Sequence, residues 1–167
     1  MDEIVWAVDP QNDTLDSLVT YVSKFAQEYL SVAQVRCRLD LPAELPPYVL
    51  PAEVRHNLFL AIKEAFNNVV KHAHATEVWL RLEVRPHAFT VVIEDNGRGL
   101  QSGQPDTVTP GRISSGHGLA NMAKRLAASG GRCVITGTPG PGTRVELSVD
   151  LTAPRSPEVG TGRNGAG

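Results

Sequence analysis

The sequence predicts an α+β fold, a two-layer sandwich in which three main helices cover one face of a mixed, mostly antiparallel sheet. The first observation is the order of the periodic segments, which runs helix, strand, helix, strand, strand, loop, helix, strand, strand. The second is composition, because 41% hydrophobic and 20% charged residues are ordinary for a folded domain. The third is length, since 167 residues suffice for one domain with a sizeable core and leave no room for a second.

The first helix and the first strand are predicted from two different periods. Apolar residues recur every three to four positions over 15–29, which is typical of an amphipathic helix. Asn12, Asp13 and Thr14 precede this segment, and each is a suitable helix N-cap. Apolar and polar residues then alternate over 35–41, and this pattern indicates a half-buried strand.

The second helix is predicted over 52–72, a stretch without glycine or proline. Its apolar stripe consists of Leu58, Ile62, Ala65, Phe66 and Val69. Two strands are predicted next, at 78–84 and 89–93, from alternation in the first and β-branched residues in the second. The dipeptide Pro86-His87 marks a tight connection between them.

The remaining segments complete the predicted order. Residues 100–115 are polar and lack an apolar pattern, and we interpret this long loop as a mobile lid. A short helix is predicted at 118–129 and is stopped by two glycines. Two final strands are predicted at 133–138 and 144–151, on either side of a Pro-Gly-Pro-Gly turn.

Charge and hydropathy exclude several classes of function. The formal net charge is −2 and the lysines and arginines are scattered, so we expect no nucleic-acid partner. No apolar run is long enough to cross a bilayer and no signal peptide is recognisable, so we expect a cytoplasmic chain without membrane contact. Cys37 and Cys133 form no metal-binding or disulfide pattern, and we expect both to be core thiols.

A polar stripe runs beside the apolar stripe of the second helix. Glu64, Asn68 and Lys71 lie at positions i, i+4 and i+7, and such a stripe is also what a plain solvent-exposed helix face presents. Asparagine is a weak helix former, so Asn67 and Asn68 in mid-helix favour a compensating role. An amide oxygen is a suitable anchor for Mg²⁺, which takes oxygen ligands and shares substrate phosphates.

Two glycine-rich segments are the other candidate sites. Asp95, Gly97 and Gly99 follow a strand; Asn-Gly is also a hairpin signal, but no alternating strand follows it. The glycines would let the backbone approach a flat ligand, and Asp95 would accept a hydrogen bond from an exocyclic amine. Gly116 and Gly118 lead into a helix, where free backbone N–H groups can hold phosphates or where the glycines only give flexible entry.

The order and spacing of these segments, with the Gly142-Thr143 pair before the last strand, resemble the ATPase superfamily of gyrase, a heat-shock chaperone, histidine kinases and a mismatch-repair protein. The resemblance implies a Bergerat-type ATP-binding fold. Residues 64–73 resemble the asparagine box of bacterial two-component sensor histidine kinases of the nitrate- and lipid-sensing kind. Residues 2–10 resemble the segment that joins their dimerisation helix to the catalytic domain. The resemblance therefore implies a linker at 1–12, a catalytic domain at 13–151 and a flexible tail at 152–167.

The resemblance also implies the cofactors ATP and Mg²⁺ and a set of site residues. The implied cofactor-binding residues are Asn68, Lys71, His72, Asp95, Gly97, Gly99, Gly116, His117, Gly118, Leu119 and Thr143. In that set Asn68 coordinates Mg²⁺, Asp95 contacts the adenine amino group, and Thr143 supports Asp95. The glycines at 97 and 99 shape the adenine pocket, and those at 116 and 118 close the lid on the phosphates. Glu64 matches the acidic residue that polarises the nucleophile in hydrolysing members.

The implied function is transfer of the γ-phosphoryl group of MgATP to a histidine, with a response regulator as its next acceptor. The histidines here are His56, His72, His74, His87 and His117. None is followed by an acidic residue, as the family's acceptor is, so we expect the acceptor on a dimerisation domain of the parent protein. That parent is compatible with an inner-membrane anchor, and the isolated chain is expected to be monomeric and not to phosphorylate itself.

Two alternatives share this fold and stay open on the sequence. One is a free-standing anti-sigma-type kinase that phosphorylates serine or threonine on a partner. The other is a hydrolytic ATPase or nucleotide-dependent interaction module in which Glu64 activates water.

Overall fold

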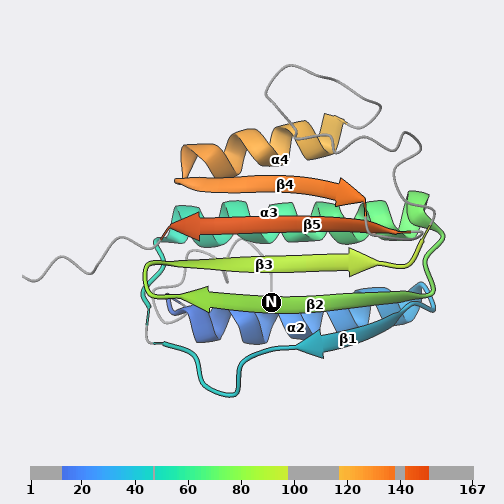
Figure 1. The fold of residues 1–167 in the computed structure, drawn as a ribbon, viewed down its shortest axis with the longest axis horizontal. Helices are drawn as coiled ribbons and strands as arrows, with labels where there is room; N and C mark the ends of the chain where they lie inside the picture. Colours follow the sequence, from blue (N-terminus) through green and yellow to red (C-terminus); the bar gives the residue numbers. More distant parts are fainter. Residues whose placement is uncertain (1–12, 47, 98–116, 138–141, 151–167) are drawn as a thin grey trace, which may run out of the picture.

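A computed structural model describes residues 13–46, 48–97, 117–137 and 142–150 (Figure 1). The helices are α2 (Leu15–Val32), α3 (Ala52–Asn68), the π-helix η2 (Val69–Ala73) and α4 (His117–Ala128). The strands are β1 (Arg36–Asp40), β2 (Glu77–Arg85), β3 (Ala88–Asp95), β4 (Gly131–Gly137) and β5 (Thr143–Asp150). The lid, the turn before residue 142, the linker and the tail that the sequence predicts lie outside the described residues.

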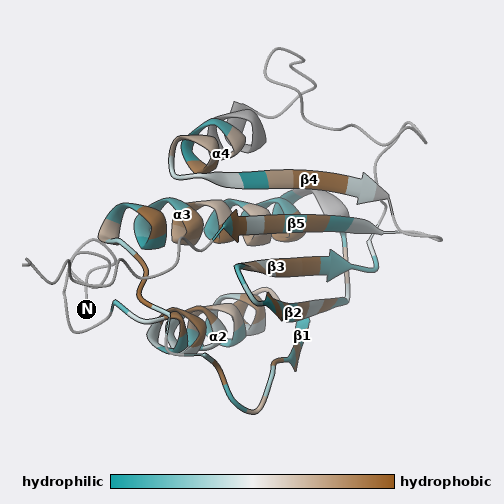
Figure 2. Cartoon of the chain, turned by 60° about the vertical axis from the view of Figure 1, so that its left-hand side comes forward, coloured by the Kyte–Doolittle hydropathy of each residue, from teal (hydrophilic) through white to brown (hydrophobic). Residues whose placement is uncertain are grey.

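The five strands form one mixed sheet in the order β1-β2-β3-β5-β4. β1 pairs in parallel with β2, whereas the three other pairings are antiparallel. The helices α2, α3 and α4 all cover one face of this sheet, as two views show (Figures 1 and 2). The predicted two-layer sandwich with a mostly antiparallel sheet is therefore confirmed.

The hydrophobic core lies between the helices and the sheet. β3 contributes Phe89, Val91 and Ile93, alternate residues that are all nearly inaccessible to solvent. From the helical side, Phe25 of α2 packs edge-on against Phe59 of α3, with ring centroids 5.2 Å apart. Every residue of the predicted apolar stripe of α3 is buried. Residues from the strands and residues from the apolar faces of the helices thus pack in one core, as the sequence indicates.

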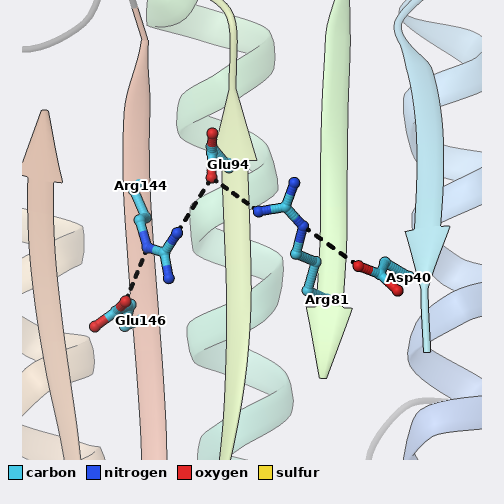
Figure 3. Close-up of polar contacts among 5 residues, drawn as sticks. All are labelled: Asp40, Arg81, Glu94, Arg144 and Glu146. Atoms are coloured by element: carbon cyan, nitrogen blue, oxygen red, sulfur yellow. Dashed lines mark hydrogen bonds and ion pairs between the residues drawn. The ribbon is translucent and has the colours of Figure 1, made fainter. Parts of the chain in front are cut away.

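The opposite face of the sheet carries a row of charged side chains (Figure 3). Glu94 of β3 accepts from Arg81 of β2 at 3.3 Å and from Arg144 of β5 at 3.4 Å. Arg81 also pairs with Asp40 at 3.6 Å, and Arg144 with Glu146 at 2.8 Å. Such partly exposed pairs each contribute little to stability. These charged residues lie on the face that the helices leave uncovered, although Thr90 and Val92 of β3, on that same face, are also buried.

Three details differ from the prediction. The second helix is α-helical only to Asn68 and ends as a π-helix, so Lys71 does not continue the spacing of Glu64 and Asn68. β1 is mostly exposed rather than half-buried, because it lies at the sheet edge and pairs on one side only. Consequently Cys37 on β1 is only half-buried, whereas Cys133 is buried as predicted.

Helix termini follow the predicted signals. The side chain of Thr14 is the N-cap of α2 and accepts a hydrogen bond from the backbone N–H of Ser17 at 3.2 Å. At the far end of α4, Gly130 has φ +77°, a conformation that favours glycine. Within the described residues, no helix is long and apolar enough to cross a membrane.

Candidate functional site

Elements that carry the candidate residues converge on one end of the molecule. The end of α3, the end of β3 and the start of β5 lie toward the right in Figure 1, and α4 also begins on that side. The pairing of β3 with β5 is antiparallel, so the last residue of β3 lies beside the first residue of β5. The topology therefore brings the polar stripe of α3 and the Asp95 segment to the same end of the sheet.

The helix α3 changes its hydrogen-bonding pattern immediately after Asn68. Residues Val69–Ala73 form η2, and His74 then adopts a left-handed conformation with φ 50°. π-helical turns are rare and frequently occur at functional sites. This widened turn includes two of the predicted cofactor-binding residues, Lys71 and His72. Lys71 is exposed, and the side chain of His72 lies outside what the structure describes. The apolar pattern contained no signal for it.

The two α-helical members of the polar stripe are half-buried rather than fully solvated. Glu64 and Asn68 lie one turn apart on α3, at the end that leads into η2. Val69, the next residue, is 5% exposed and belongs to the core. The turn that carries Asn68 is thus anchored on its inner side while its polar face remains accessible.

Asn67, next to Asn68, is held by the first helix. The hydroxyl of Tyr29 on α2 donates a hydrogen bond to its Oδ1 at 3.2 Å. Sequence reasoning singled out the Asn67-Asn68 pair but did not find this partner. The tyrosine belongs to the apolar stripe of α2, so the polar hydroxyl on an otherwise apolar face was the only sign in the sequence of a hydrogen-bond partner.

Asp95 is the most deeply buried acidic group of the described part of the site, with 5% exposure. Its Oδ1 accepts the backbone N–H of Gly97 at 2.8 Å, and the backbone of Thr143 directly across the strand pair donates to it as well. Burial raises the pKa of this carboxyl; the two backbone hydrogen bonds oppose the increase, and Glu94 adds to it. The carboxylate is therefore oriented, poorly hydrated and able to accept further hydrogen bonds.

Asn96 makes contacts that the sequence did not indicate. Its Oδ1 accepts the backbone N–H groups of Thr76 and Glu77, each at 3.0 Å, and its Nδ2 donates to Oγ1 of Thr76 at 2.9 Å. The backbone N–H of Asn96 also donates to the carbonyl of Glu77 at 3.3 Å. From the sequence, Asn96 is recognisable only as part of an Asn-Gly turn signal.

The remaining predicted residues are only partly placed. Gly99 and Gly116 lie outside the described residues. His117, Gly118 and Leu119 form the first turn of α4, so the predicted helix start is confirmed to within one residue, although their side chains lie outside the described part.

The described site offers hydrogen-bond acceptors rather than a ready-made metal cage. Among the described residues no group of three or more His, Cys, Asp and Glu side chains could hold a metal ion. Asp95 provides a dry carboxylate at the sheet end, and Asn68 provides an amide oxygen at the helix end. A site of this kind can bind a ligand that brings its own charge and shares a metal ion with the protein.

A comparison with family models decides the family. Residues 53–153 match the model described as "Histidine kinase-, DNA gyrase B-, and HSP90-like ATPase". The chain belongs to this family. The match covers α3 from its second residue, the whole Asp95 segment and the last strand, so every candidate site residue lies within the matched region.

Curated relatives of this ATPase chain are sensor histidine kinases. "Signal transduction histidine-protein kinase/phosphatase DegS" of Brevibacillus brevis is 33% identical over 102 residues, 61% of this chain and 25% of DegS. The similarly described UhpB of Salmonella typhimurium is 39% identical over 95 residues, 57% of this chain and 17% of UhpB. The matching segment thus spans a quarter or less of each of these two relatives.

Solved structures show the same ATPase fold. The histidine kinase domain of the Erythrobacter litoralis EL346 blue-light activated kinase superposes with a TM-score of 0.65 at 21% identity, over 87% of this chain and 64% of that chain. Full-length ShkA in complex with AMPPNP superposes with a TM-score of 0.64 at 19% identity, over 83% of this chain and 30% of that chain. At these identities the likeness concerns the fold.

Proposed function

We propose that this chain binds MgATP and serves as the catalytic domain of a sensor histidine kinase. The observation that carries the proposal is Asp95, a buried carboxylate oriented by the backbone of Gly97 and Thr143 at the end of β3. An ionised carboxylate accepts several hydrogen bonds, and the two backbone donors leave capacity for an adenine amino group. Membership of the ATPase family and the kinase relatives support this reading.

Asn68 is the proposed protein ligand of Mg²⁺. Its side chain is a half-buried amide at the last α-helical turn of α3, and an amide oxygen is a hard ligand of the kind that Mg²⁺ prefers. The other ligands would be phosphate oxygens and water. When bound, the ion would neutralise charge on the phosphates, while Asn68 would orient them and the exposed Lys71 of η2 would add a positive charge.

In the proposed reaction a ring nitrogen of a histidine attacks the γ-phosphorus of ATP. The bond from the γ-phosphorus to the β,γ-bridging oxygen breaks, and ADP leaves. Glu64, which is half-buried one turn before Asn68, would polarise the attacking histidine nitrogen. The acceptor histidine lies on a dimerisation domain of the parent protein, and a response regulator then accepts the phosphoryl group. We propose 13–151 as this catalytic domain, 1–12 as its linker and 152–167 as its tail.

Calorimetric titration of MgADP and a nonhydrolysable ATP analogue tests the proposal. The wild-type chain is expected to bind both, and Asp95→Asn is expected to lose binding because an amide presents a donor as well as an acceptor. Asp150→Asn is the matched control, since this exposed residue pairs with Ala88 at the opposite end of β3. Absence of binding by a folded wild-type chain would overturn the proposal.

A further inference from the structure

Asn96 joins two neighbouring segments at the end of the sheet that carries the candidate site. One is the turn at the end of β3, where Asn96 stands between Asp95 and Gly97. The other is the start of β2, where its side chain makes three hydrogen bonds of 2.9–3.0 Å to Thr76 and Glu77. Both ends of its side-chain amide are thus engaged, and its backbone bond to Glu77 continues the β2–β3 pairing beyond Asp95.

Thr76 is closely connected to the asparagine-box helix. Only three residues separate the last residue of η2, Ala73, from β2, and the first of them is the left-handed His74. Because this connection is so short, a displacement of Thr76 also displaces the end of the π-turn. The carbonyl of Thr76 is also occupied, because it accepts the backbone N–H of Arg36 at 2.9 Å.

We infer that Asn96 is a positioning residue that sets the π-turn after Asn68 relative to Asp95, and so aligns the metal-and-phosphate half of the nucleotide site with its adenine half. This inference rests on the proposed function. Asn96 itself is not proposed to touch either half of the ligand. It acts through Thr76 and Glu77 on one side and through its chain neighbours Asp95 and Gly97 on the other.

A comparison with another asparagine separates this positioning role from general stabilisation of the fold. Asn57 on α3 is a second asparagine that bridges distant segments, since its Nδ2 donates to Oγ of Ser129 at 2.7 Å and to the carbonyl of Arg125 at 3.3 Å. It precedes Asn68 by eleven positions, about 16 Å along the helix. Loss of Asn57 removes comparable hydrogen bonds without touching either half of the site.

The test measures how much Mg²⁺ increases the affinity for ADP. Calorimetric dissociation constants for ADP are determined with Mg²⁺ and with EDTA for the wild type, Asn96→Ala and Asn57→Ala. We expect Asn96→Ala to lower this Mg²⁺-dependent gain in affinity about tenfold. The reason is that ADP bound at the adenine half would then hold its phosphates out of line with Asn68. We expect Asn57→Ala to retain the wild-type gain, although it lowers the melting temperature.

A second pair of variants covers the case in which Asn96→Ala does not fold. Thr76→Val deletes the Oγ1 acceptor of one of the three bonds, whereas Thr76→Ser keeps it. We expect a reduced Mg²⁺-dependent gain in Thr76→Val and recovery in Thr76→Ser. Equal gains in Asn96→Ala and wild type, or in Thr76→Val and Thr76→Ser, would overturn the inference while leaving nucleotide binding intact. Absence of ADP binding by the wild type would instead overturn the proposed function.

Discussion

The hydroxyl of Tyr29 donates a hydrogen bond to Oδ1 of Asn67, and this contact joins α2 to the last α-helical turn of α3. The ring of Tyr29 stacks on Phe25 with centroids 5.4 Å apart, so its position is set by packing as well as by the hydrogen bond. Asn67 immediately precedes the proposed Mg²⁺ ligand. The first helix therefore has a direct polar link to the turn on which nucleotide binding is proposed to depend.

Removal of the Tyr29 hydroxyl should destabilise the chain moderately. Tyr29→Phe keeps the stacked ring and leaves Oδ1 of Asn67 without this donor, so we expect the free energy of unfolding to fall by about 1 kcal/mol. Urea denaturation of Tyr29→Phe, Asn67→Ala and the double variant measures the coupling. Strictly additive effects of the two single changes would show that the hydrogen bond makes no contribution.

Neutralising Asp95 should stabilise the fold while it removes nucleotide binding. Burial raises the pKa of Asp95 above its ordinary value of 3.8, so the charged form is disfavoured in the folded state. The folded chain then binds the proton more tightly than the unfolded chain, and the penalty is absent below the unfolded pKa and complete above the raised folded pKa. We expect Asp95→Asn to be more stable than wild type by about 0.5–2 kcal/mol near neutral pH.

The pH dependence provides the check on that sign. Denaturant titrations at about pH 7 and about pH 4 should show a smaller advantage of Asp95→Asn at the lower pH, where wild-type Asp95 is increasingly protonated. Asp150→Asn, at an exposed position, again serves as the control. An advantage that grows on acidification would contradict the assigned cause of the pKa shift.

Ser23 presents a different opportunity for stabilisation. Its Oγ is buried and has no hydrogen-bond partner among the described residues, and it lines an apolar cavity of about 20 Å³ with Ile62 and Leu80. Ser23→Ala removes an unsatisfied hydroxyl, so we expect a gain in unfolding free energy of about 1 kcal/mol. The exposed Ser31 of the same helix is the control, because Ser31→Ala changes helix propensity without removing a buried hydroxyl. Equal melting-temperature shifts in both variants would assign the gain to propensity alone.

Substitution of Glu64 distinguishes a phosphotransfer function from a hydrolytic one. In the proposed kinase, Glu64→Ala should bind MgADP like the wild type but transfer phosphate to a supplied histidine-bearing dimerisation domain about a hundredfold more slowly. The product is distinguished by its acid lability, and Glu53→Ala, in the first turn of α3, is the control. Steady-state ATP hydrolysis by the chain alone that disappears in Glu64→Ala would favour the hydrolytic alternative.

Much of the fold was predictable because its signals are local. The apolar stripe of the second helix, the alternation in β2 and the β-branched run in β3 mark core positions, most of which are buried in the structure. The exposure of β1 was not predictable from its alternating residues, since alternation does not reveal that a strand lies at a sheet edge. The π-turn after Asn68 likewise leaves no trace in the apolar periodicity, because Val69 fits the α-helical stripe equally well.

The sequence by itself determined the order of helices and strands, the residue types available for chemistry and the positions of Glu64, Asn68 and Asp95 within their segments. Those features depend on periods and spacings along the chain. Only the tertiary structure decided that Tyr29 meets Asn67, 38 positions away, and that Asn96 meets Thr76, 20 positions away. A hydrogen bond between distant residues depends on the packing and register of whole elements, which no short stretch of sequence specifies.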